Sequence, residues 1–126
     1  MSSRNLEAAM AAIHTSARSA EETDWAQIVT LYDALLRLRP SPVVALNRAI
    51  AISQHEGPER GLEAIDAIAD RERLSNYPFY FAAIGELELK RGRHAAARSA
   101  FESALALARN DMERRFFAER VHASTA

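Results

Sequence analysis

The chain has 126 residues, of which 48% are hydrophobic and 26% are charged. Its net charge of −1 gives no overall attraction to nucleic acid or to an anionic membrane, and the absence of cysteine excludes disulfides, thiolate catalysis and cysteine-bound zinc. The first residues lack the apolar core of a secretory signal, and no apolar stretch approaches the roughly 20 residues of a membrane span. We therefore expect a single cytoplasmic domain over residues 1–126.

Apolar residues recur at helical spacing along the chain, and no segment shows the alternation of a strand. Prolines at positions 42, 58 and 78 suit the first turns of helices, while Asn110 and Asp111 can close one helix and cap the next. The pattern predicts an all-α fold of about seven helices in antiparallel hairpins. The expected helices cover about 4–17, 24–38, 42–54, 58–69, 78–91, 94–108 and 112–122.

The sequence also repeats itself with a period of about 34 residues, one helix hairpin per unit, which is typical of tetratricopeptide repeats. The last unit resembles that family most closely. A domain of this kind is a short right-handed superhelix of about three units and a final capping helix. The repeat-defining residues of the last unit are Phe81, Ile84, Gly85, Gly92, Ala97, Phe101, Ala104 and Leu105.

The repeat gives a reason for Gly85, because glycine inside a helix costs roughly 0.5–1 kcal/mol relative to alanine. The resemblance implies that Gly85 lets the second helix of the hairpin approach closely, with a small residue such as Ala97 opposite. It also implies that Gly92 permits the turn and that Phe101 fills the space between units.

The middle unit departs from the family at two positions. Ile50 stands at the phase of Gly85, and Asp66 stands at the phase of Phe101. We expect Ile65 or Ile68 to fill the core position that Asp66 leaves.

Four segments carry a more specific resemblance: TDWAQIVTLYDALL, PSPVVALNRAIAI, GPERGLEAIDAI and LARNDMERRFFAERV. They resemble the C-terminal extension of a group of bacterial extracytoplasmic-function sigma factors. The resemblance implies a tetratricopeptide-like domain that contacts its own sigma domains, the RNA polymerase core or a regulatory protein or peptide. The sigma domains would lie upstream of this chain. The sequence has no helix-turn-helix and no basic recognition helix, so we expect no direct DNA binding by this region.

In such arrays the first helices of successive units line a groove that binds peptides. Asn47 can hydrogen-bond a peptide backbone, and Arg48 can pair with a carboxylate. Alternatively, both residues hold the RPSP loop or pair with Asp24 or Asp33 inside the domain. The candidate groove residues are Val44, Asn47, Arg48, Gln54, Phe79 and Glu86.

Other polar and aromatic residues have simpler interpretations. Trp25 and Tyr32 share a helix face, for which we favour core packing over a binding platform. The arginines near the C-terminal end are interleaved with Glu113 and Glu119, which is typical of a solvated surface. These basic residues are Lys90, Arg91, Arg93, Arg114, Arg115 and Arg120.

Catalysis, metal binding and cofactor binding are not expected. His14, His55, His94 and His122 lie far apart in the sequence, and no nucleophile elbow or glycine-rich phosphate loop occurs. The sequence therefore favours a protein-contact domain that modulates transcription initiation. The alternatives are a free-standing scaffold for an unrelated peptide and a small-molecule sensor with a pocket near Trp25, Tyr32 and Phe79.

Overall fold

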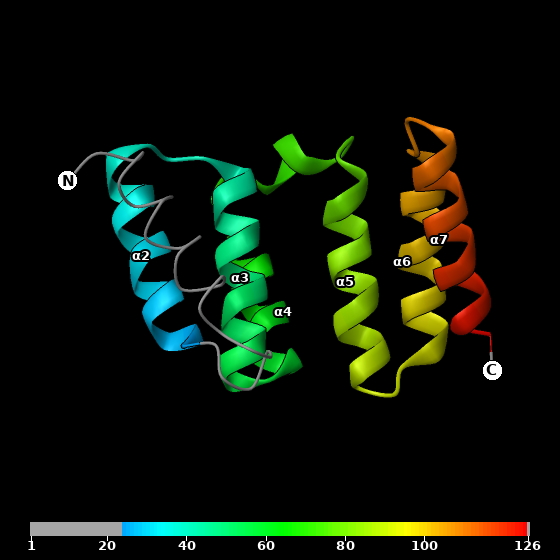
Figure 1. The fold of residues 1–126 in the computed structure, drawn as a ribbon, viewed down its shortest axis with the longest axis horizontal. Helices are drawn as coiled ribbons and strands as arrows, with labels where there is room; N and C mark the ends of the chain where they lie inside the picture. The colour runs from blue at the N-terminus through cyan, green and yellow to red at the C-terminus, as the bar shows by residue number, and fades with distance from the viewer. Residues whose placement is uncertain (1–23, 126) are drawn as a thin grey trace. The chain divides into compact units, whose positions relative to one another are not determined.

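A computed structural model describes residues 24–125, and in this range it contains helices and no strand. The predicted all-α class is thus confirmed for this part of the chain, whereas the helix expected over 4–17 lies outside the described residues. The α-helices are α2 Trp25–Leu38, α3 Pro42–Glu56, α4 Pro58–Asp66, α5 Pro78–Lys90, α6 His94–Ala106 and α7 Asp111–Ala123, with a 3-10 turn η1 at Arg71–Leu74 (Figure 1).

Three helices begin at polar caps that the sequence supplies. The side chains of Asp24, Ser41 and Asn110 each accept a hydrogen bond from the backbone N–H three residues further on, at 3.0, 3.3 and 2.8 Å. Each bond satisfies one of the N–H groups that have no partner within the first helical turn. The starts of α2, α3 and α7 are therefore set by local chemistry.

Proline marks the starts of α3, α4 and α5, as expected. The end of α4 differs from the prediction, because the helix expected over 58–69 stops at Asp66 and a 3-10 turn follows at Arg71–Leu74. Leu74 in this turn is only 2% exposed. Burial of this side chain is a tertiary effect that local spacing does not reveal.

The chain forms two compact units, which divide between Ala69 and Asp70. In the first unit α3 packs against both α2 and α4, and in the second unit α6 packs against both α5 and α7 (Figure 1). In each unit the principal packing is therefore between helices that follow one another in the chain.

The first unit has a core of aliphatic side chains. Ile65 and Ile68 are 1% and 9% exposed, while Asp66 lies at the surface. The expectation that a neighbouring isoleucine replaces Asp66 in the core is confirmed, and both isoleucines do so. Other buried members of this unit are Ile28, Leu35, Leu46, Ala49, Ala51 and Ile52.

The second unit is built around the ring of Phe101, which is fully buried and clusters with Ala82, Ala97 and Phe117. A Cβ atom added at Gly85 would lie 2.8 Å from the Cε1 and Cζ atoms of Phe101, closer than real Cβ contacts allow. The close approach expected at Gly85 therefore exists. We expected Ala97 opposite Gly85, but the nearest atoms belong to the ring of Phe101.

The turn between α5 and α6 requires a glycine. Gly92 has a φ of 76°, in the left-handed region that residues with a Cβ rarely adopt. The backbone N–H of Arg93 donates to the carbonyl of Glu88 at 2.9 Å and so helps to close the end of α5. The role expected for Gly92 is confirmed.

None of the helices between residues 24 and 125 combines the length and the apolar character that crossing a bilayer requires.

Candidate functional site

The α3 surface in the first unit carries four of the candidate groove residues. Arg48 donates from Nε to Oδ1 of Asp33 on α2 at 2.5 Å, and the two side chains are 34% and 41% exposed. The structure thus shows Arg48 paired inside the domain, which was one of the two interpretations of this residue. Asn47 and Gln54 are exposed, so their amide groups are accessible to a partner.

Val44, another candidate on α3, has a packing role. It is half-buried against Leu35, together with Leu31, Tyr32 and Ala34 of α2. Burial raises the pKa of the Tyr32 hydroxyl, because the phenolate loses solvation. Tyr32 therefore packs on the core, as expected, and Val44 joins the same contact.

A cleft of about 290 Å³ lies between α3 and α4. Its apolar walls come from Ile52 and Ala64, and its charged rim includes Arg60, which pairs with Glu63 at 2.8 Å and with Glu56 at 3.9 Å. Arg48 completes the lining. Because these charges already have partners within the first unit, the cleft is lined by paired charges of both signs and does not attract ions of one sign.

The second unit presents aromatic rings near the start of α5. Phe79 is 36% exposed and lies edge-on to the buried Phe117 ring, with 5.5 Å between the ring centroids. Tyr77 is tilted against Phe79 at 5.8 Å. The guanidinium carbon of Arg109 lies 6.0 Å from the Tyr77 ring centroid and 5.7 Å from the Phe79 centroid, within range of a cation–π attraction.

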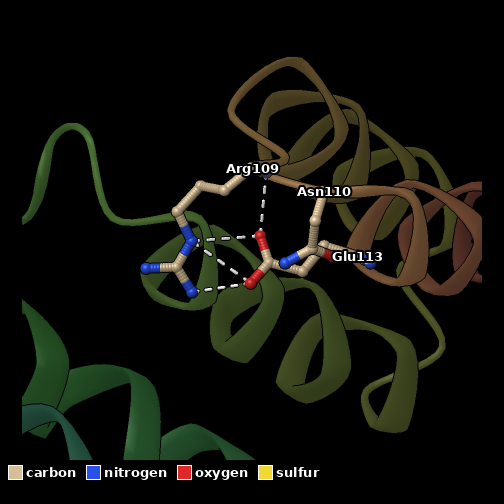
Figure 2. A network of polar contacts seen from close by, with 3 residues as sticks. All are labelled: Arg109, Asn110 and Glu113. Atoms are coloured by element: carbon tan, nitrogen blue, oxygen red, sulfur yellow. Dashed lines mark hydrogen bonds and ion pairs between the residues drawn. The ribbon is translucent and has the colours of Figure 1, made fainter.

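Arg109 is held in place by Glu113, and Figure 2 shows the contacts between these two residues. Its Nη2 donates to Glu113 Oε2 at 2.6 Å, while its Nε and its backbone N–H donate to Oε1 at 3.1 and 2.9 Å. The guanidinium bond and then the backbone bond lower the pKa of Glu113 below its usual range. Asn110 accepts from the Glu113 backbone N–H, so the start of α7 and the position of Arg109 are fixed together.

Glu86, the second candidate on α5, is bound from α7. Arg120 Nη2 donates to Glu86 Oε1 at 2.5 Å, and the Arg120 guanidinium lies 5.4 Å from the Phe101 ring centroid. The Nε of Arg120 is buried and has no hydrogen-bond partner among the described residues. Within the second unit Glu86 thus joins α5 to α7, and its carboxylate is already engaged.

Most of the arginines near the C-terminal end of the chain also have partners. Arg114 is paired with Asp111, and Arg91 donates to Glu88 at 2.9 Å. Together with the Arg120 pair, these contacts offset much of the positive charge, as expected for a solvated surface.

Three of the four histidines can be placed. His55, His94 and His122 are all exposed, and His14 lies outside the described residues. Between residues 24 and 125 no three histidine, aspartate or glutamate side chains are gathered as metal ligands.

Two features of this surface were not predicted from the sequence. The Arg109–Glu113 contact has the i, i+4 spacing of a helical ion pair, and Asn110 with Glu113 has the spacing of a capping box, so a local signal was available. The position of Arg109 over Tyr77 and Phe79 has no local signal, because it depends on how α5 and α7 pack.

Between residues 24 and 125 the protein is helical, with the exposed amides of Asn47 and Gln54 on α3 and the partly exposed ring of Phe79 on α5. No family model matches the chain. It is 49% identical over 108 residues to an uncharacterized protein of Rhizobium meliloti (strain 1021). The match covers 86% of this chain and 25% of the relative, so the chain spans about a quarter of that protein's length.

Proposed function

We propose that this chain is the tetratricopeptide-like C-terminal extension of an extracytoplasmic-function sigma factor and that it modulates transcription initiation through protein contacts. Its partners would be the sigma domains of the same polypeptide, the RNA polymerase core or a regulatory protein. In this proposal the chain works in the cytoplasm, performs no catalysis and does not read DNA itself.

The observation that carries the proposal is the resemblance of four segments to that group, with PSPVVALNRA as its most specific string. In the structure this string forms the α2–α3 turn and the first half of α3. Ser41 caps α3, Pro42 starts it, and Leu46 and Ala49 are buried. The exposed Asn47 has no role in this packing, so its place in the string is better explained by a contact with a partner.

The repeat arrangement is supported by the second unit. Gly85 admits the ring of Phe101, and Gly92 takes the left-handed conformation of the turn. Glu86 and Arg120, which form a pair between α5 and α7, are separated by 34 residues, the length of one repeat. In such an array, the first helices of successive repeats would contact each other through residues one repeat length apart.

The relative from Rhizobium meliloti is consistent with a domain inside a longer polypeptide. Three quarters of that protein lie outside the matched region, given the 25% coverage. We propose that the polypeptide beyond the match includes the sigma domains.

The proposed contacts are made by the exposed candidates, Asn47 and Gln54 on α3 and Phe79 on α5. Arg48 and Glu86 act by positioning, because each already binds an opposite charge within its own unit. An Arg48→Ala change would leave Asp33 without its partner, whereas Asn47→Ala removes an exposed amide and no ion pair. Asn47→Ala is therefore the cleaner variant.

The proposal is tested by titrating the purified, fluorescently labelled chain with extracytoplasmic-function sigma domains and with core RNA polymerase from the source bacterium. We expect saturable binding to at least one of them and weaker binding for Asn47→Ala and Phe79→Ala. The matched control is His94→Ala, an exposed change on α6. No binding to either partner would reject the sigma-factor role, and binding of an unrelated peptide instead would favour a free-standing scaffold.

A further inference from the structure

The outer surface of α7 exposes apolar side chains that no other described part of the second unit covers. Met112 is 80% exposed and Phe116 is 44% exposed, while Phe117 on the adjacent side of the helix is fully buried. A helix turns by about 100° per residue, so Met112, Phe116 and Ala123 project within about 40° of one another. We call these three residues the α7 stripe.

The α7 stripe is bordered by opposite charges. Arg115 and Glu119 are exposed and lie one turn apart on the same edge of the stripe. Arg114, the neighbour of Arg115, is paired with Asp111, but within residues 24–125 neither Arg115 nor Glu119 has an oppositely charged partner. One helix thus presents an apolar stripe, an available cation and an available anion.

This combination is complementary to itself under a two-fold rotation. When two copies of α7 lie antiparallel with the axis near Phe117, Arg115 of one copy faces Glu119 of the other, and the pair occurs twice. The two Phe116 rings then meet across the axis, and each Met112 falls beside the small Ala123 of the second copy. A parallel arrangement would put the charged edges on opposite sides and would lose both pairs.

We propose that the chain associates with a second copy of itself through the α7 stripe, in an antiparallel two-fold contact. The proposed partner is a second copy of the chain, because Arg115 and Glu119 of one α7 helix face the opposite charges of a second, antiparallel α7 helix. The contact spans one helix of 13 residues and is smaller than the roughly 1,200–2,000 Å² that stable complexes bury. The dimer is therefore weak and reversible.

The first test is sedimentation velocity of the 126-residue chain from about 0.01 to about 1 mM, the range in which small interfaces associate. We expect the weight-average mass to rise toward twice the monomer mass for the wild type and to stay at the monomer value for Phe116→Asp. A wild-type chain that stays monomeric throughout would overturn the proposal. Association that Phe116→Asp leaves unchanged would also overturn it.

The second test exchanges the charges. Arg115→Glu and Glu119→Arg should each weaken association by roughly ten-fold, because each change removes both pairs and creates like-charge contacts. The double exchange Arg115→Glu/Glu119→Arg should recover most of the loss, since the pairs re-form in reverse. A double variant as weak as the single variants would overturn the antiparallel arrangement.

The control for Arg115→Glu is Arg98→Glu on α6, which makes the same change of net charge away from the stripe and should not alter association. Circular dichroism of every variant confirms that the helices are retained. This inference does not depend on the sigma-factor role. A monomeric chain that binds sigma domains through Phe116 would overturn the dimer and leave the proposed function standing.

Discussion

Replacing Gly85 by alanine tests the packing that organises the second unit. Alanine is the better helix former, and in an open helix the change would stabilise the protein by about 0.5–1 kcal/mol. Here the new Cβ would lie 2.8 Å from two ring atoms of Phe101 and 2.9 Å from a third. The ring is fully buried, so it cannot swing into solvent.

The expected effect is the balance of these two terms. Inserting a methyl group into a filled core typically costs about 1–3 kcal/mol. Subtracting the gain in helix propensity leaves a net loss of about 1 kcal/mol in the free energy of unfolding. For a unit of this size that loss lowers the melting temperature by about 4–8 °C.

Urea unfolding followed by circular dichroism measures this difference, and a double-mutant cycle identifies its cause. In a Phe101→Leu background the ring is gone, so Gly85→Ala should become neutral or stabilising. Ala96→Gly, at an exposed position of α6, measures the cost of a helical glycine in this protein. A Gly85→Ala protein more stable than the wild type would refute the account of the close approach.

Three further predictions concern single contacts. Acidification should destabilise Glu113→Gln less than the wild type. The lowered pKa of Glu113 gives the wild type stability that is present above about pH 4.3 and is lost as the pH falls through the pKa of the folded state. Equal acid sensitivity of the two proteins in urea unfolding would contradict this. Phe117→Ala should cost about 3–5 kcal/mol, and Phe116→Ala about 1 kcal/mol or less, in dilute solution; comparable losses would mean that the burial of the two rings is misassigned. A double-mutant cycle on Arg48 and Asp33, both more than a third exposed, should give a coupling of only about 0–1 kcal/mol; a much larger value would show a pair shielded from solvent.

The helix boundaries could be predicted because local chemistry sets them. Proline at positions 42, 58 and 78 and the cap at Asn110 act within one turn of the chain, and the observed starts follow them. The end of α4 was missed, because the 3-10 turn that follows depends on burying Leu74.

The contacts between helices were predicted less well, because they depend on tertiary packing and not on local sequence. The repeat pattern indicated that something approaches Gly85, but only the packing of α5 on α6 shows that this is the ring of Phe101. Asp33 could be proposed for Arg48, because α2 and α3 are joined by a short turn. Glu86 and Arg120 lie on helices a full repeat apart. At that separation, charge and spacing in the sequence do not identify which residues pair.

The sigma-factor role is tested most directly by run-off transcription with core polymerase and the polypeptide that the proposal requires, in which sigma domains precede this chain. The proposal predicts promoter-dependent initiation by that polypeptide. It also predicts a rate that changes when the residues from Leu6 onward are removed, or when Asn47→Ala and Phe79→Ala are introduced together. Transcripts that do not depend on that polypeptide, or that are unaffected by removing this region, would contradict the regulatory role.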